Sequence, residues 1–150
     1  MKNLIWGIAL VFLLAVPFSR PLYAQDAAKL EALLETPALS WEQTAAFVLE
    51  AASAEPSFDY AAGQKWLPKN VSPGDTARLG GVALLLMRSF DVKGGMFYSM
   101  MKSPHHAYRE LVYKRVISGN ADPGMPVSGR QLILMVNRLL AMTEKAGVSE

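Results

Sequence analysis

Histidine and methionine side chains stand close together in one stretch of the chain, and these residue types can bind a soft metal ion. His105 and His106 are adjacent, and Met96, Met100 and Met101 precede them. Imidazole with thioether sulfur suits Cu(I). Neighbouring residues on a helix, however, point about 100° apart, and methionine commonly fills gaps in protein cores. We therefore predict no metal site and no cofactor.

The serine residues lack the surroundings of a catalytic nucleophile. Ser99, Ser103 and Ser128 stand in no motif that supplies an activating base or a sharp strand-to-helix turn. The glycine pairs at 80–81 and 94–95 lack the strand–turn–helix context of a phosphate-binding loop. The first pair is better suited to a close approach of two helices, and the second to a hinge. The sequence thus predicts a protein that acts by binding, not an enzyme.

Residues 1–24 have the features of an export signal peptide. Lys2 supplies a positive charge, residues 4–16 are apolar and uncharged, and Pro17 follows ahead of a predicted cleavage after Ala24. Cleavage would release the protein into the periplasm or cell envelope, whereas an uncleaved apolar run would serve as an anchor. No later stretch is long enough to span a membrane without charges. We expect no transmembrane segment after signal removal.

Charge is unevenly distributed along the predicted exported chain. Without Lys2 and Arg20, 13 basic residues balance 13 acidic ones. Residues 25–60 contain seven acids and one base, whereas residues 61–150 contain 12 bases and six acids. Attraction between two halves of one domain explains this pattern, and a basic face for an anionic envelope polymer is the alternative. Nucleic acid is not an expected partner, and the absence of cysteine excludes disulfides and thiolate metal sites.

Helical periodicity dominates the exported chain. Core-facing positions recur at i, i+3, i+4, i+7 and i+8 in three segments that begin at Thr44, Val82 and Leu132. Residues 40–43 and 128–131 are Ser-x-x-Gln capping boxes ahead of two of these segments. Alternating strand patterns are scarce, so we predict an all-α fold.

The remaining helix signals lie between and before these segments. Ser72 and Pro73 indicate that the middle helix starts earlier than its two counterparts. Ser103 followed by Pro104 is a natural start for another helix, and residues 26–35 form a further short one.

A duplication with a period of fifty residues relates two parts of the chain without a gap. The matched pairs include Phe58 and Tyr108, Trp66 and Val116, Pro73 and Pro123, Gly74 and Gly124, Val82 and Leu132, and Arg88 and Arg138. A third, eroded copy covers residues 39–52. Repeats of this length bury each unit's apolar face against its neighbours. We predict one domain of helix–loop–helix repeats at residues 25–146, with a frayed tail at 147–150.

The last unit resembles the repeat of the S-layer homology (SLH) domain. The similar elements are residues 106–111, 115–119, 122–124 and 127–131, with Phe90, Asp91 and Val92 upstream. The resemblance implies three units in a compact, pseudo-threefold SLH-like helical bundle. It also implies a tether to peptidoglycan or a polysaccharide linked to it, bound at the start of each unit's second helix.

The candidate binding residues stand at these three helix starts. They are Ser40, Trp41, Arg78, Ser128 and Arg130. The family's arginine position holds Trp41, Leu79 and Gly129, so Arg78 and Arg130, one residue to either side, would substitute for it. The leading interpretation is an exported, non-catalytic cell-envelope binding module that contacts a peptidoglycan-linked polymer or an envelope protein.

A second candidate surface is the segment of residues 95–101. Its large apolar residues are Met96, Phe97, Tyr98, Met100 and Met101. If exposed, such a group marks a site for a partner or a membrane surface. Burial between two repeats is the commoner outcome, and we expect it. Exposure would favour the alternative function, a periplasmic protein–protein interaction or assembly factor that kept the SLH-like scaffold and lost polysaccharide binding. Two interpretations are likewise open for Trp41 and Trp66: their rings are stacking platforms for sugars, or they anchor the core.

Overall fold

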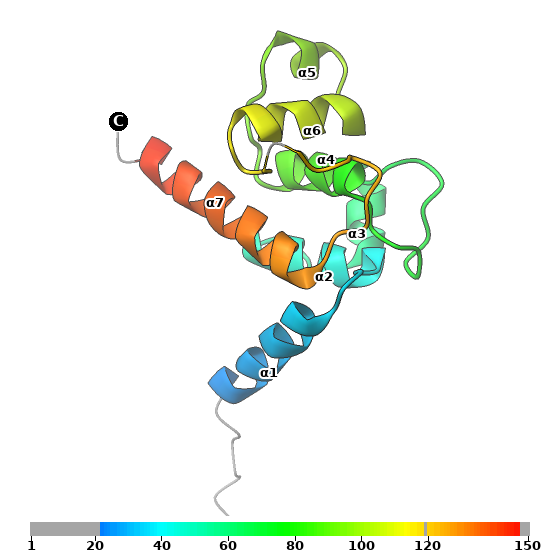
Figure 1. Ribbon diagram of the computed structural model, residues 1–150, viewed down its shortest axis with the longest axis vertical. Helices are drawn as coiled ribbons and strands as arrows, with labels where there is room; N and C mark the ends of the chain where they lie inside the picture. The colour runs from blue at the N-terminus through cyan, green and yellow to red at the C-terminus, as the bar shows by residue number, and fades with distance from the viewer. Residues whose placement is uncertain (1–21, 119, 148–150) are drawn as a thin grey trace, which may run out of the picture.

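The computed structural model describes residues 22–118 and 120–147, and these residues form seven α-helices (Figure 1). The helices are α1 (Leu22–Glu35), α2 (Trp41–Ala51), α3 (Phe58–Gly63), α4 (Leu79–Ser89), α5 (Met96–Met100), α6 (Pro104–Tyr113) and α7 (Gly129–Gly147). Within the described ranges no strand forms, and the only extended pairings are two isolated bridges, Ser40 with Thr76 and Arg78 with Pro126. The all-α prediction is confirmed.

The two predicted end segments lie largely outside the described residues. The predicted signal peptide overlaps them only from Leu22, where α1 begins, so the expected cleavage after Ala24 falls in the first turn of α1. Helix α7 continues to Gly147, and the rest of the predicted frayed tail lies beyond it.

Three backbone segments meet in a closed ring of hydrogen bonds at the centre of the fold. The amide of Leu39 donates to the carbonyl of Val127 at 2.9 Å, Val127 donates to Ala77 at 3.0 Å, and Ala77 donates to Leu39 at 2.8 Å. All three residues are fully buried. Each stands two positions before the first residue of a helix, so the ring brings the starts of α2, α4 and α7 together.

The first amides of the same three helices also donate hydrogen bonds, each to a carbonyl in a neighbouring segment. Such amides have no partner within their own helix. Trp41 donates to the carbonyl of Asp75 at 2.9 Å, Leu79 to Met125 at 3.0 Å, and Gly129 to Thr36 at 3.0 Å. The connector before α4 therefore caps α2, the connector before α7 caps α4, and the turn before α2 caps α7.

Helix α4 is the central element of the core. Every residue from Leu79 to Met87 is buried, which is typical of a helix packed on all sides. It lies against α2 and α6 (Figure 1). The ring of Trp41 packs at Gly81, because a Cβ atom there would lie only 2.8 Å from Trp41 Cη2. This contact confirms the predicted close approach of two helices at Gly81, whereas a Cβ atom at Gly80 would meet its nearest neighbour, Pro123, at 3.4 Å.

The structure corrects the predicted start of the middle helix. Helix α4 begins at Leu79, in register with α2 and α7, and not near Ser72. Ser72 and Asp75 instead close a turn, in which the Ser72 amide donates to Asp75 Oδ2 at 2.8 Å and the Asp75 amide donates to the Ser72 carbonyl at 3.0 Å. The Ser40 capping box forms as predicted, and Ser103 caps α6 with Pro104 at its first turn.

The first helices of the two duplicated units, α3 and α6, both end before the paired positions Trp66 and Val116. Helix α3 ends at Gly63 and α6 at Tyr113. Lys65 and Arg115 follow in the left-handed region, each with φ of 59°. The next amides donate to carbonyls inside the preceding helix: Trp66 donates to Ala61 at 3.0 Å, and Val116 donates to Leu111 at 2.9 Å. This is the Schellman helix end, and it turns Trp66 and Val116 back toward the core.

Gly129 provides a test of the packing between α1 and α7. A Cβ atom at Gly129 would overlap the backbone carbonyl of Leu33 in α1, whereas one at Gly63 would meet nothing within 4 Å. Because the obstacle is backbone, Gly129→Ala should lower the free energy of unfolding by about 1–3 kcal/mol. Gly63→Ala should leave stability equal or raise it by up to about 1 kcal/mol. Urea denaturation measures both, and equal midpoints for the two variants would contradict the described contact.

Candidate functional site

Two adjoining clefts lie beside the starts of α4 and α6. The first has a volume of about 630 Å³ and the second about 690 Å³. Pro68, Val71 and Pro104 belong to the walls of both. We call the two clefts together the connector groove, because the turns that precede α4 and α7 supply much of the lining. These are the same turns whose carbonyls cap α2 and α4.

Basic side chains dominate the charged lining of the connector groove. Arg78 lies in the first cleft, and Lys65, Lys69 and Lys102 lie in the second. Asp75 is the one carboxylate in the two linings, and its Oδ2 accepts the Ser72 amide. All five residues are exposed to solvent. Four cations against one anion give the groove a positive potential that attracts anionic ligands.

Arg78 is held in place at the edge of the first cleft. It occupies the N-cap position of α4, where its backbone is extended. Its Nη1 donates to the carbonyl of Gly124 at 2.6 Å, which fixes the guanidinium against the connector before α7. Since a guanidinium carries five N–H donors and this bond uses one of them, Arg78 can also bind a carboxylate or phosphate.

Trp41 is a core residue that closes the inner side of the first cleft. Its side chain is 2% exposed, although it contributes to the lining. A buried indole cannot serve as an open stacking platform for a sugar, so that interpretation is wrong for Trp41. Trp66 is half-buried and lies edge-on to Tyr60, with ring centroids 5.8 Å apart. It too packs against the core.

Only two of the five candidate residues from the helix starts line the connector groove. Ser40, Arg78 and Ser128 each directly follow a residue of the hydrogen-bonded ring, at the starts of α2, α4 and α7. Trp41 and Arg78 share the first cleft. Arg130 is exposed on the first turn of α7 and is not part of the connector groove.

The two candidate serines act as helix caps. Ser40 Oγ accepts the amide of Gln43 at 3.2 Å, and Ser128 Oγ accepts the amide of Gln131 at 3.2 Å. In α2 the box is complete, because Gln43 Oε1 also accepts the Ser40 amide at 3.0 Å. Their hydroxyls therefore have a structural partner in each case.

The apolar segment of residues 96–101 is exposed, so the expected burial is wrong for four of its five large residues. The exposed fractions are 70% for Met96, 68% for Phe97, 77% for Met100 and 58% for Met101. Tyr98 alone points inward, with 5% exposed. Its burial raises the pKa of the phenol above the usual value, and the nearby Asp91 and Glu110 act in the same direction against Arg88.

The histidine pair lies in the first turn of α6. His106 Nδ1 lies 2.7 Å from Ser103 Oγ, beside the cap of α6, and the two imidazole rings are nearly perpendicular. Within the described ranges, no group of three or more histidine, cysteine or acidic residues could hold a metal ion. None of the helices described is both long and apolar enough to cross a membrane.

The comparisons with known proteins give no identity for this chain. No protein-family model, no curated protein and no solved structure matches it. The function must therefore be inferred from the geometry of the connector groove and of the exposed apolar segment.

Sequence reasoning missed the three lysines of the connector groove. Lys65 and Lys69 lie near the end of α3, whereas Lys102 lies between α5 and α6, and only the fold brings them together. The available signal was the reversal of charge after residue 60. That reversal predicted a basic face but could not select its members.

Replacing the two serines tests whether they are caps or ligand contacts. Ser40→Ala and Ser128→Ala should each lower the free energy of unfolding by about 0.5–2 kcal/mol, because a helix amide loses its acceptor. Binding of a polyanion such as heparin, measured by calorimetry at a temperature where both variants are folded, should be unchanged. A loss of affinity without a loss of stability would assign the hydroxyls to ligand binding.

Proposed function

We propose that this protein is an exported, non-catalytic binding module of the cell envelope that holds an anionic, peptidoglycan-linked polymer in the connector groove. The observation that carries the proposal is the lining of that groove, with Arg78, Lys65, Lys69 and Lys102 against the single carboxylate of Asp75. Export and envelope location rest on the signal-like residues 1–24.

The groove has the mixed chemistry that a charged polysaccharide requires. Its walls include apolar surfaces from Phe58, Leu67 and the shared residues Pro68, Val71 and Pro104. Such surfaces suit the C–H faces of sugar rings, while the cations bind acidic substituents. Because the two clefts adjoin, a chain of several sugars could contact Arg78 at one end and the lysines at the other.

Two features of the scaffold support a second part of the proposal, namely that the chain consists of SLH-like repeats in a pseudo-threefold arrangement. Leu39, Ala77 and Val127 make equivalent hydrogen bonds ahead of α2, α4 and α7. Lys65 and Arg115, fifty residues apart as the duplication requires, have the same left-handed φ of 59° at equivalent helix ends. We propose that these three helices are the second helices of three related units.

Removal of groove cations should weaken binding to purified cell-wall sacculi. If each cation contributes about 1 kcal/mol, the double variant Arg78→Ala with Lys69→Gln should bind roughly 30-fold more weakly in co-sedimentation. Arg130→Ala is the matched control, because it removes one exposed cation outside the groove. No co-sedimentation of the parent protein at low salt, or an equal loss for Arg78→Ala and Arg130→Ala, would refute the proposal.

The nature of the polymer can be tested with the same assay. Sacculi stripped of their acidic polysaccharides should bind much less protein, because the exposed cations lose their counter-charges. Binding to intact sacculi should also fall steeply as NaCl increases from 0.02 to 0.5 M, since salt screens exposed charges. Equal binding to stripped and intact sacculi would show that the ligand is not the anionic polymer.

A further inference from the structure

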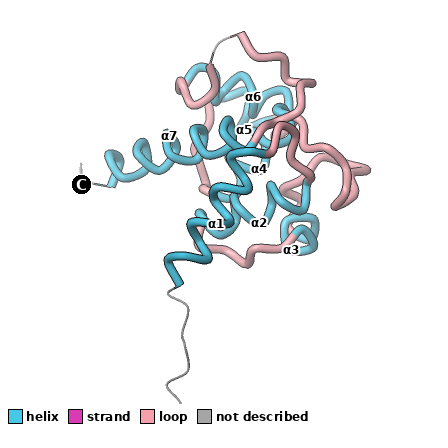
Figure 2. Tube along the Cα trace, turned by 60° about the horizontal axis from the view of Figure 1, so that its bottom comes forward, coloured by secondary structure: helices cyan, strands magenta, loops and turns pink. Residues whose placement is uncertain are grey.

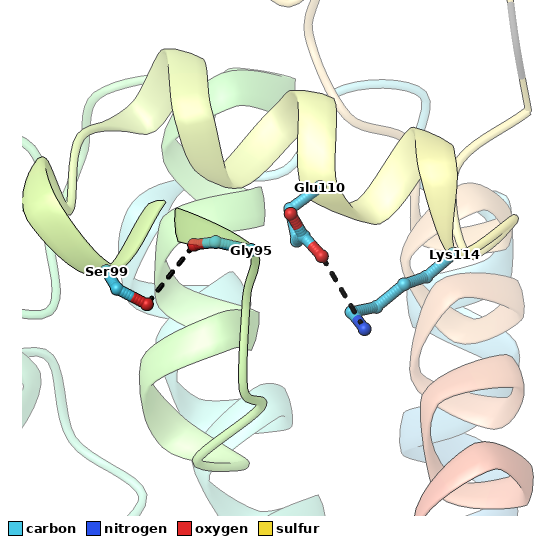
Figure 3. A network of polar contacts seen from close by, with 4 residues as sticks. All are labelled: Gly95, Ser99, Glu110 and Lys114. Atoms are coloured by element: carbon cyan, nitrogen blue, oxygen red, sulfur yellow. Dashed lines mark hydrogen bonds and ion pairs between the residues drawn. The ribbon is translucent and has the colours of Figure 1, made fainter. Parts of the chain in front are cut away.

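The α5 loop, residues 94–102, is a folded element that presents apolar side chains outward. Tyr98 anchors it, and a Cβ atom at Gly94 would overlap the Tyr98 ring, so that these two residues pack tightly. Ser99 Oγ donates to the carbonyl of Gly95 at 3.1 Å, beside Glu110 of α6 (Figure 3). The inward turn of Tyr98 leaves Met96, Phe97, Met100 and Met101 facing solvent.

The position of the α5 loop leaves it free to contact a large surface. It stands beyond α6 at one end of the molecule, and α1 extends at the opposite end (Figure 1); the view in Figure 2 also separates α5 from α1. Exposed apolar residues grouped in this way mark an interaction site. A stable protein interface uses about 20–30 residues from each partner, which is far more than residues 94–102 supply.

Basic residues surround this apolar tip. Lys93 precedes the loop and Lys102 ends it, and both are exposed. Arg109 of α6 is exposed as well and lines a cleft with Phe97 and Met101. Of the nearby acids, Glu110 pairs with Lys114 at 3.5 Å (Figure 3), so that Asp91 is the remaining carboxylate to set against the charges of Lys93, Lys102 and Arg109.

We propose that the α5 loop docks on the surface of an anionic lipid bilayer. The four apolar side chains would enter the boundary between headgroups and acyl chains, and Lys93, Lys102 and Arg109 would contact lipid phosphates. A fluid bilayer needs no preformed pocket, and flexible methionine side chains adapt to it. This surface shares Lys102 with the connector groove, but its four apolar residues, Lys93 and Arg109 lie outside that groove, so polymer binding and lipid docking can be tested separately.

A single-cysteine probe tests the docking directly, because the chain contains no cysteine. Met100→Cys and Leu134→Cys, each labelled with nitrobenzoxadiazole, place the dye on α5 or on the half-exposed Leu134 of α7. With vesicles of phosphatidylglycerol and phosphatidylcholine, the dye at position 100 should brighten several-fold and the dye at position 134 should change little. Vesicles of phosphatidylcholine alone should give a smaller response at position 100. No brightening at position 100, or equal brightening at both positions, would overturn the proposal.

A second variant keeps the anchor of the loop and removes its apolar tip. Met96→Ser with Phe97→Ser and Met100→Ser retains Tyr98, and circular dichroism verifies that the variant is folded. Its co-sedimentation with anionic vesicles should weaken by about tenfold or more. Residues 1–21 are identical in parent and variant, so their contribution cancels. Lys93 lies outside the connector groove. Lys93→Gln should weaken vesicle binding, and the loss of affinity should increase with the anionic lipid content of the vesicles.

The same variants distinguish a bilayer from a cell-wall polymer or a protein as the partner of the α5 loop. The triple serine variant should bind sacculi as the parent does, so polymer binding and lipid docking can fail separately. A photo-crosslinking residue at position 97 should capture no single protein in living cells. Capture of one identified protein, with no vesicle response at position 100, would replace the bilayer with a protein partner and overturn the proposal.

Discussion

The hydrogen-bonded ring of Leu39, Ala77 and Val127 is the constraint on which the rest of the structure depends. A buried amide or carbonyl left without a partner costs about 1–3 kcal/mol, and each of these three residues uses its amide for one neighbour and its carbonyl for the other. No pair can form the ring without the third. The starts of α2, α4 and α7 are thereby fixed relative to one another, although they are far apart in the sequence.

The connector groove is a direct consequence of this junction. Asp75 and Pro123 line its first cleft with their neighbours, and their carbonyls accept the amides of Trp41 and Gly80. The turns therefore cannot move away from the helix starts without breaking buried hydrogen bonds. Arg78 depends on the same arrangement, because its partner is the carbonyl of Gly124 in the next connector. The groove is thus held open by the interactions that hold the fold together.

Helix α4 connects the two proposed binding surfaces. Arg78 precedes its first residue, and Lys93 and the α5 loop follow its last one. Lys102 lines the second cleft and also ends the α5 loop. Both proposals together describe a protein that rests on a bilayer surface while it holds a cell-wall polymer alongside. The buried α4 is about 16 Å long, from 1.5 Å per residue, and separates Arg78 from the residues that lead to the α5 loop.

The sequence by itself determined the features that depend on neighbours a few residues away. The caps at Ser40, Ser103 and Ser128, the apolar stripes of α2, α4 and α7 and the all-α class follow from contacts within one helical turn. Tertiary structure decided the rest. The start of α4 moved to Leu79 because its first amide is capped by Met125, which the local pattern cannot reveal. Phe97 is exposed, and Lys65 and Lys102 line the same cleft, because of the way in which distant segments pack together. Burial and electrostatic potential are properties of that packing.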